Sequence, residues 1–297
     1  KALNFLDTID FPTVIKADGL AAGKGVFIAK NKNEAVETIK NIMSKRIFGA
    51  SGENIIIEEF LEGEEISFFA LVDTKGFILP LTTAQDHKKI GEGDTGLNTG
   101  GMGAYSPVPF IKQNQINDFV IKFVKPVIDD LKRNNIFFSG VFYAGLILTK
   151  YGPKLLEINV RFGDPEAQAI LPRLKTDLLD LLLASSKGRL DQLRPPEWDN
   201  NFCINVVMAS KGYPESYKKN TIIGGLNKTT VNKSQYIFHS STKKNEYHWL
   251  ATGGRVLSIS ALGSTLKEAR NKAYNVINEI DWKSGYYRND IGWKHLT

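Results

Sequence analysis

The amino-acid sequence predicts an α+β protein, and three observations carry this prediction. Short β-rich runs surround one helical stretch in the first quarter of the chain. A long amphipathic helix and a strand pair occupy the middle, and two further strands precede a capped helix near the end. The chain has 297 residues, of which 42% are hydrophobic and 24% charged, so it has ordinary globular composition. Collagen, coiled-coil and largely disordered architectures are thereby excluded.

The first predicted unit covers residues 1–73 and consists of a lead-in followed by a small α+β subdomain. Its helix runs over residues 34–45, because four apolar side chains recur there on one helical face: Ala35, Ile39, Ile42 and Met43. Its strands are the β-rich runs TVIKA, VFIAK, NIIIEEF and EISFFALVD.

The second predicted unit covers residues 74–193. A strand FILPLTT leads into a long Gly-rich loop over residues 86–109, and a helix follows in which Pro126 marks a kink. The apolar positions of this helix are Ile116, Phe119, Val120, Phe123, Val127 and Leu131. The runs VFYAGLILTK and KLLEINV, separated by Tyr151-Gly152-Pro153, predict a hairpin, although the proline is also compatible with a strand start. A helix over residues 175–187 closes the unit.

The third predicted unit covers residues 194–297. Arg194-Pro195-Pro196 indicates a linker, since two prolines extend the chain and forbid a helix across the join. The runs FCINVVMAS and GRVLSISALG predict strands. Thr265 and Glu268 have the spacing of a capping box before an amphipathic helix.

Composition and charge narrow the functional classes. The single cysteine, Cys203, forms no internal disulfide and no Cys/His group has zinc spacing, so a reducing, cytoplasmic location is expected. No run is long enough to span a bilayer, and the N-terminal residues do not have the pattern of a signal peptide. The net charge is 38 minus 32, or +6, but the lysines are scattered. This favours a small anionic, phosphorylated ligand over a nucleic acid.

A Gly-rich segment, VIKADGLAAGKGV at residues 14–26, is the strongest local feature. Lys16 ends a strand, and a loop with Gly19, Gly23, Lys24 and Gly25 follows. Glycines let backbone amides approach phosphate oxygens, and two ammonium groups neutralise their charge. The spacing is neither that of a Walker A loop nor that of a dinucleotide fingerprint. A triphosphate cradle and a solvated Gly-rich hairpin are equally compatible with this segment alone.

A second candidate is IIIEEFLEGEEIS at residues 55–67, an apolar strand that runs into closely spaced glutamates. Carboxylates beside an aromatic residue suit a purine ring and its ribose hydroxyls. Considered alone, the segment is more typical of a solvated acidic turn.

A third candidate is LLEINVRFGDPE at residues 155–166. Glu157 and Asn159 alternate on a strand, so both side chains lie on one face and can share a magnesium ion that also holds phosphates. Arg161 continues this face if the strand persists, and there it can stabilise an oxyanion or bind a substrate phosphate. A buried Glu and Asn on an apolar strand would be costly without partners, which favours a ligand-binding role over a purely structural one.

The fourth candidate is the polar stretch TTAQDHKKIGEGDTGLNTGGMGAYSP at residues 82–107. It is too long and too polar for a mere connector, and such loops usually bind a ligand. Its candidate residues are Asp86, Lys88, Asp94, Asn98, Thr99, Gly100 and Gly101. His87 has no spaced partner, so a structural role is favoured over metal ligation.

These four segments, in this order, resemble the phosphoribosylamine–glycine ligases, a family of ATP-grasp enzymes of purine biosynthesis. The resemblance covers residues 11–293. It rests on the motifs IKADGLAAGKGV, EEFLEGEE, QDHK, NTGGMGAYSP, EINVRFGDPE, GGRVL and DIGW.

The resemblance implies roles for individual residues. It assigns ATP binding to Lys16, Gly23, Lys24, Gly25, Glu58, Glu59, Phe60, Leu61 and Glu65, with Glu65 on the ribose. It assigns one Mg²⁺ or Mn²⁺ site to Glu157 and Asn159, and catalytic roles to Arg161 and Lys24. It assigns substrate binding to Asp86, Lys88, Asn98, Thr99, Gly100, Gly101, Arg161 and Asp164.

The implied fold is an ATP-grasp fold, two α+β subdomains that sandwich ATP, followed by a small C-terminal α+β domain. The implied reaction joins glycine to 5-phosphoribosylamine through a glycyl phosphate, with release of ADP and phosphate. A monomer without nucleic-acid or membrane partners is expected. The alternatives are another ATP-grasp carboxylate–amine ligase of nucleotide metabolism and an inactive ATP-binding fragment.

The sequence departs from the family pattern in two ways. The run VFYAGLIL has no acid where many relatives carry a further metal carboxylate, so metal binding rests on two protein ligands, phosphates and water. The chain also starts without methionine and without the N-terminal domain of the family, which predicts a truncated protein.

Overall fold

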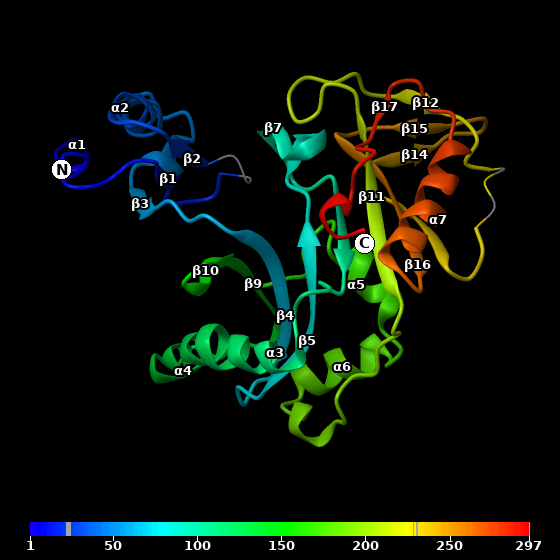
Figure 1. Cartoon of the computed structure of the whole chain (residues 1–297), viewed down its shortest axis with the longest axis horizontal. Helices are drawn as coiled ribbons and strands as arrows, with labels where there is room; N and C mark the ends of the chain where they lie inside the picture. The colour runs from blue at the N-terminus through cyan, green and yellow to red at the C-terminus, as the bar shows by residue number, and fades with distance from the viewer. Residues whose placement is uncertain (22–24, 228, 230, 297) are drawn as a thin grey trace. The chain divides into compact units, whose positions relative to one another are not determined.

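The computed structural model describes residues 1–21, 25–227, 229 and 231–296 and divides the chain into two compact units, Lys1–Gly63 and Glu64–Thr297 (Figure 1). Each unit has a hydrophobic core of its own. Among the described residues, no helix is both long and apolar enough to cross a membrane.

The first unit packs helices against a small antiparallel sheet. Its strands are β1 (Thr13–Ala17), β2 (Val26–Ala29) and β3 (Ile55–Glu59), paired in the order β2-β1-β3. Helix α1 (Ala2–Phe5) precedes them, and α2 (Lys32–Ile39) continues into a π-helical turn, Lys40–Ser44. Asn31 caps α2 by accepting a hydrogen bond from the amide of Glu34. Ala35 and Ile39 of α2 and Ile42 of the π-helical turn are buried on one face, which confirms the helix that the periodicity predicts.

The second unit is built on one large, mainly antiparallel sheet with strand order β10-β9-β4-β5-β8-β11-β16-β13. These strands are β4 (Glu64–Val72), β5 (Ile78–Asp86), β8 (Gly103–Ser106), β9 (Gly140–Thr149), β10 (Gly152–Asn159), β11 (Phe202–Ser210), β13 (Gln235–His239) and β16 (Arg255–Gly263). The short β17 (Gly285–Tyr286) pairs with β11. Smaller sheets are formed by β6 (Lys89–Gly91) with β7 (Thr95–Asn98), and by β12 (Thr221–Ile223), β15 (Trp249–Ala251) and β14 (Thr242–Lys244).

Strand β4 shows how the two faces of the large sheet differ. Ile66, Phe68, Ala70 and Val72 point to one face and pack on α3 (Gln113–Phe119) and α4 (Lys125–Arg133). On the opposite face, Phe69 and Leu71 pack against α6 (Leu178–Ser186), whereas Glu65 and Ser67 continue that face as polar residues. Polar side chains therefore lie at one end of the sheet face that packs against α6.

The long amphipathic helix is divided at the predicted proline. A π-helical turn, Val120–Val124, joins α3 to α4, and Pro126 lies in the first turn of α4, where its missing N–H costs no helical hydrogen bond. The predicted hairpin is also confirmed, because β9 and β10 pair antiparallel across the turn before Gly152.

In the C-terminal part, α7 (Leu266–Asn278) packs on β11 and β16. The predicted N-cap is confirmed, because Thr265 Oγ1 accepts from the amide of Glu268. The Glu268 carboxylate accepts from the amide of Ser264 rather than from that of the N-cap residue Thr265, so the capping box is only half formed. Near it, α5 (Ala167–Ile170) lies on the other face of the same sheet, where Ser260 Oγ donates to the carbonyl of Gln168 at 2.7 Å.

The structure differs from the predicted organisation in three respects. The first compact unit ends at Gly63 rather than at residue 73, because β4 pairs with β5 and β9 of the large sheet. Residues 86–109 are more than a loop, since they contain β6, β7, β8 and a 3-10 turn, Glu92–Asp94. The C-terminal strands extend the large sheet through the pairing of β8 with β11. The predicted boundary between residues 193 and 194 stays a prediction.

Candidate active site

In the first unit, the structure brings two predicted ATP-binding side chains together. Lys16 on β1 and Glu58 on β3 lie on neighbouring strands, and Lys16 Nζ is 2.6 Å from a carboxylate oxygen of Glu58. The carbonyl of Gly25 accepts from the amide of Ala17 and so closes the end of the β1–β2 hairpin. Gly23 and Lys24, the remaining residues of the predicted cradle, lie outside the described residues.

The other predicted ATP-binding residues continue from β3. Glu59 ends this strand, half-buried Phe60 and Leu61 follow it, and Glu65 lies in β4 of the second unit. The segment that the resemblance assigns to adenine thus lies at the end of the first unit, shortly before the boundary at Gly63.

The second unit gathers titratable side chains on the polar end of one sheet face. Ser67 on β4 is buried and lies 3.0 Å from the hydroxyl of Tyr143 on β9, and it donates to Glu166 at 2.8 Å. In the strand register, Ser67 and Glu157 both lie beside Gly145. Burial raises the pKa of Tyr143, and the charges of Glu166, Glu157 and Asp86 raise it further.

Lys88 is the cation of this cluster. Its Nζ lies 2.7 Å from a carboxylate oxygen of Glu65. Burial alone lowers the pKa of Lys88, but the carboxylates of Glu65, Glu157 and Asp86 outweigh it and raise the pKa above its ordinary value. The ammonium therefore stays charged, and the structure pairs a predicted substrate residue with a predicted ribose residue.

Asp86 is the exceptional carboxylate of the cluster. Its Oδ1 atom is buried and has no hydrogen-bond partner among the residues that the structure describes. Burial raises the pKa of Asp86 well above its ordinary value, and Glu166 adds to this, while Lys88 and Arg255 oppose it. A buried carboxylate without a partner is costly to the fold, so this atom is suited to receive a donor from a ligand.

Gly100 and Gly101 affect the shape of the site, but their amides are not free to donate hydrogen bonds to a ligand. The Gly100 amide donates to the hydroxyl of Tyr213 at 3.0 Å, and the Gly101 amide donates to Thr99 Oγ1 at 2.9 Å. Gly101 has φ = +107°, and a Cβ there would lie 2.6 Å from Asp86 Oδ1. Both amides therefore have partners within the protein, and the absence of a side chain at Gly101 lets the backbone lie close to Asp86.

Two more predicted substrate residues have contrasting environments. Asn98 is exposed at the end of β7. Asp164 is occupied on both carboxylate oxygens, since Oδ1 accepts from Gln168 and Oδ2 lies 3.2 Å from Arg255.

The predicted metal ligands lie on one face of the edge strand β10, opposite Gly145 and Tyr143 of β9. A Cβ on Gly145 would lie 2.8 Å from Glu157 Cγ, so the glycine leaves room for the glutamate. Glu157 is exposed and Asn159 is half-buried, because β10 is an edge strand that pairs only with β9 among the described strands. The cost of burial therefore does not bear on Glu157. One carboxylate and one amide oxygen fit Mg²⁺, which retains water and phosphate ligands. Among the described residues, no group of three His, Cys, Asp or Glu side chains has metal-binding geometry.

Arg161 does not continue the Glu157–Asn159 face. Strand β10 ends at Asn159, and Arg161 is exposed and donates to the carbonyl of Phe162 at 2.9 Å. The predicted alignment of Arg161 with the metal ligands required the strand to continue, and the strand ends before Arg161.

His87 has the structural role that the sequence favours. Its Nε2 accepts from the amide of Gly292 at 3.0 Å, so the ring is neutral, with its proton on Nδ1 facing Asp94 Oδ1 at 3.4 Å. Buried Arg288 donates to Asp94 and to the carbonyl of Lys89. These contacts join the β6–β7 hairpin to the C-terminal segment.

Sequence reasoning missed several residues of this site: Ser67, Gln85, Tyr143, Glu166, Arg255 and Arg288. A signal existed for Ser67 and Tyr143, since each is a polar residue inside an otherwise apolar strand run. Arg255 lies within the GGRVL motif, but its partners are remote in sequence.

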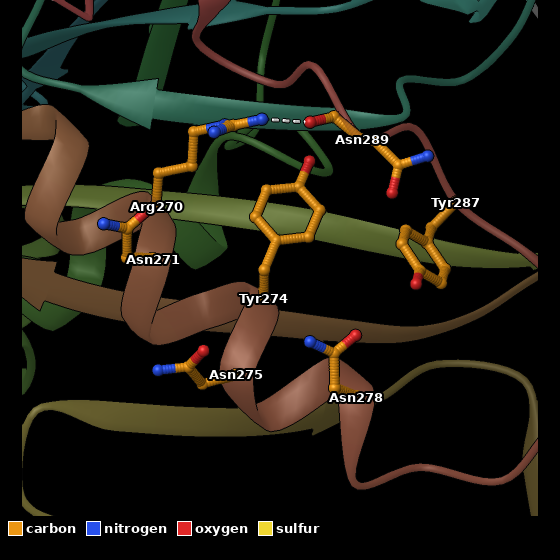
Figure 2. Close-up of a pocket in the computed structure, with 7 residues that line it drawn as sticks. All are labelled: Arg270, Asn271, Tyr274, Asn275, Asn278, Tyr287 and Asn289. Atoms are coloured by element: carbon orange, nitrogen blue, oxygen red, sulfur yellow. Dashed lines mark hydrogen bonds between the residues drawn. The ribbon is translucent and has the colours of Figure 1, made fainter.

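A separate hollow lies between α7 and the C-terminal segment (Figure 2). It has a volume of about 450 Å³ and is lined by Arg270, Asn271, Tyr274, Asn275, Asn278, Tyr287 and Asn289. Arg270 donates to the carbonyl of Asn289 and stacks 4.9 Å from the ring centroid of Tyr274. None of the residues predicted to bind ATP, substrate or metal lines it.

Comparison with solved structures establishes the class of fold. The chain matches the crystal structure of phosphoribosylamine–glycine ligase from Thermotoga maritima with a TM-score of 0.81 and 32% identity, covering 97% of this chain and 70% of that one. It also matches the biotin carboxylase domain of Hydrogenobacter thermophilus 2-oxoglutarate carboxylase, with a TM-score of 0.72 and 16% identity, covering 96% and 60%. The second likeness concerns the fold alone.

Family models identify this fold. The ATP-grasp (A) domain of phosphoribosylglycinamide synthetase matches residues 1–167, and the C domain of the same enzyme matches residues 203–294. By fold, the chain consists of an ATP-grasp domain followed by a C-terminal domain. More narrowly, it belongs to the phosphoribosylglycinamide synthetase family, also named phosphoribosylamine–glycine ligase.

Three curated relatives bear the name phosphoribosylamine–glycine ligase. The protein of Caldanaerobacter subterraneus is 48% identical over 98% of this chain and 69% of its own length. The Rhizobium meliloti protein is 45% identical over 96% of this chain. The chloroplastic Arabidopsis thaliana protein is 48% identical over 96% of this chain. The chain spans 66% of the length of the Rhizobium protein and 54% of the Arabidopsis protein.

Proposed function

We propose that the protein catalyses ATP-dependent ligation of glycine to 5-phosphoribosylamine, giving glycinamide ribonucleotide, ADP and phosphate. The observation that carries the proposal is the gathering of Glu65, Lys88, Asp86 and Glu157 at one end of one sheet face, in a chain that belongs to this family. Carboxylates and a cation placed together suit a reaction that needs positioning and charge neutralisation rather than a nucleophilic side chain.

In this proposal, the predicted ATP-binding residues keep the roles that the resemblance implies. Lys16 and the segment through Gly23, Lys24 and Gly25 hold the phosphates. Glu58 to Leu61 hold the adenine, and Glu65 accepts from the ribose. The Lys16–Glu58 ion pair supports this role, because it fixes an ammonium group beside the β1–β2 hairpin.

Glu157 and Asn159 would hold a divalent cation, Mg²⁺ or Mn²⁺, at a single site. When bound, the cation would neutralise the charge on the phosphates of ATP. The protein's own contribution is to present two oxygen ligands on one face of β10, with Gly145 leaving space below Glu157.

Asp86 is the residue of the QDHK segment best suited to the substrate amine. A glycine ammonium group would donate to the buried Oδ1 atom and supply the partner that this oxygen lacks among the described residues. Lys88, on the same segment, would neutralise a substrate carboxylate or phosphate. Arg161 is exposed, so we propose that it binds the transferring phosphoryl group only when ligands are present.

The proposed reaction has two steps, and neither of them is an oxidation or a reduction. A glycine carboxylate oxygen attacks the γ-phosphorus of ATP and ADP leaves, giving an acyl phosphate. The amine nitrogen of 5-phosphoribosylamine attacks the acyl carbon, phosphate leaves, and the nitrogen loses a proton. Lys24 and Arg161 would stabilise the charge that develops on the transferred group.

The test is a coupled assay of ADP release with glycine and freshly prepared 5-phosphoribosylamine, in Mg²⁺ and in Mn²⁺. We expect ADP release to require both substrates, and ADP release without glycine would overturn the proposal. Formate and bicarbonate are the matched controls for other carboxylate–amine ligases.

A second candidate function is ATP binding without ligation. The chain spans 66% and 54% of the length of the two relatives above, so nucleotide binding and ligation have to be tested separately. Running the assay on this chain and on a longer polypeptide that covers the full length of the relatives separates the two candidates. Sizing chromatography of the same samples tests the expected monomer, and cell fractionation tests the expected cytoplasmic location.

A further inference from the structure

We propose that Arg255 is a positioning residue: it clamps the Gly100-Gly101 turn to the Asp164-Pro165 segment and thereby keeps the Asp86 carboxylate enclosed for the substrate amine. This inference rests on the proposed function, because it concerns the amine subsite of the same reaction. Arg255 lies in the GGRVL motif, but the resemblance implies no role for it.

The guanidinium group of Arg255 reaches both segments at once. Its Nη1 lies 2.6 Å from the carbonyl oxygen of Gly100 and 2.7 Å from that of Asp164. Its Nη2 lies 3.2 Å from Asp164 Oδ2. The two bonded segments are remote from each other in sequence, so one side chain links two loops.

The backbone of Arg255 is fixed independently of these loops. Arg255 is the first residue of β16 and lies opposite Ala209 of β11 in the large sheet. The side chain is mostly buried, with 21% of its surface exposed. A sheet-anchored, partly desolvated guanidinium is a rigid support for two loops, since it bonds several acceptors in a fixed plane.

The two clamped segments form the walls around Asp86. A Cβ built on Gly101 would lie 2.3 Å from Pro165 Cδ and 2.6 Å from Asp86 Oδ1, so Gly101 is wedged between the proline and the carboxylate. Release of either wall would expose Oδ1 to water. Burial is the main cause of the raised pKa of Asp86, and this burial depends on how firmly the two segments are held in place.

The bonding pattern explains why arginine is needed. Nη1 bonds carbonyls of both segments and Nη2 adds the contact with Asp164 Oδ2, whereas lysine would offer a single ammonium group without this planar pair of nitrogen atoms. Tyr213 offers a matched control, because its hydroxyl accepts from the Gly100 amide of the same turn but is not bonded to Asp164. A loss of local order alone would affect both variants, whereas a loss of the clamp would affect only the arginine variants.

The experiment compares Arg255→Lys, Arg255→Gln and Tyr213→Phe in the full-length protein. Three readouts are measured: the KM for glycine and for ATP with kcat, the hydrogen exchange of amides 99–103 and 163–168, and the titration of the Asp86 carboxyl by ¹³C NMR without substrates. Loss of hydrogen bonds to a charged group corresponds to about a 10-fold to 100-fold effect. We expect Arg255→Lys to raise the KM for glycine by about 10-fold or more, with the KM for ATP changed by less than about 2-fold.

The titration separates enclosure from charge. Glu166, Lys88, Glu65 and Arg255 are the charged groups that act on Asp86, and Arg255→Lys retains the positive charge. Opening the clamp should therefore lower the pKa of Asp86 toward its ordinary value through hydration alone, and amides 99–103 and 163–168 should exchange faster. Tyr213→Phe should leave the KM for glycine and the Asp86 titration unchanged.

Two results would overturn the inference. Unchanged exchange and an unchanged Asp86 titration in Arg255→Lys would show that no clamp exists. Faster exchange together with an unchanged KM for glycine in an active enzyme would show that the contacts only stabilise the fold. If the parent protein shows no glycine-dependent ADP release, the proposed function fails, and exchange and titration still decide whether Arg255 encloses Asp86.

Discussion

Asp86 and Glu157 lie on the same sheet face, but the structure gives the two carboxylates different environments. Asp86 has a buried oxygen without a partner among the described residues, whereas Glu157 is exposed on an edge strand. Substitution of Asp86 should therefore change stability, and substitution of Glu157 should not.

Asp86→Asn is expected to stabilise the fold while it lowers activity. The pKa of Asp86 is raised in the folded protein, so the unfolded state loses its proton first as pH rises, and ionisation costs stability above pH 4. Removing the charge should raise the free energy of unfolding at pH 8 by about 1 kcal/mol or more. Urea unfolding at pH 8 checks the direction, and a less stable variant would contradict it.

Glu157→Gln should lower ADP release without affecting stability, because the side chain is exposed. We expect a fall of at least about 100-fold at fixed Mg²⁺, the loss that a charged ligand of the reacting phosphates can cause. Asp191→Asn, an exposed carboxylate outside the cluster, is the matched control. Normal turnover in Glu157→Gln would remove this residue from the metal site.

At the scale of elements, the β6–β7 hairpin is tied to the C-terminal segment by His87, Asp94 and Arg288. Burial lowers the pKa of His87, while the hydrogen bond to Asp94 opposes that shift. The pKa of Asp94 is lowered by its hydrogen bond to His87 and by its contacts with Lys294 and Arg288. Both shifts make the junction less stable in acid.

The pH dependence follows from the sign of the His87 shift. Because the folded pKa lies below the unfolded value, the unfolded state takes up the proton first as pH falls below about 6.5. We expect the melting temperature to fall between pH 7 and pH 5 and His87→Gln to reduce this slope. Asp94 contributes only below about pH 4, outside this window. An equal slope in the parent protein and the variant would contradict the prediction.

At the scale of the whole second unit, buried Arg173 links the strands of the large sheet to the segment that leads into β11. Its Nη1 donates to Ser106 Oγ on β8 at 2.9 Å, and its Nε donates to the carbonyl of Asn201 at 2.8 Å. It also lies 5.7 Å from the ring centroid of Trp198. Burial lowers the pKa of Arg173 to about 10.

Arg173→Ala should destabilise the second unit strongly. It leaves the hydroxyls of Thr82 and Ser106 and the carbonyls of Asp199 and Asn201 without this donor, which corresponds to about 3 kcal/mol of the free energy of unfolding. Arg133→Ala, which removes an exposed ion pair of α4, should change it by less than about 1 kcal/mol. Chemical denaturation of both variants measures the difference, and equal losses would contradict the prediction.

The amino-acid sequence by itself determined the features that depend on neighbours along the chain. Local spacing and backbone chemistry account for the Thr265 cap of α7, the start of α4 at Pro126, the β9–β10 hairpin and the shared face of Glu157 and Asn159. Only the tertiary structure decided that β4 belongs to the large sheet, that Arg161 leaves the Glu157 face, and that Arg255 meets Gly100 and Asp164. The physical reason is that strand pairing, burial and the enclosure of Asp86 depend on residues remote in sequence, which local periodicity does not record.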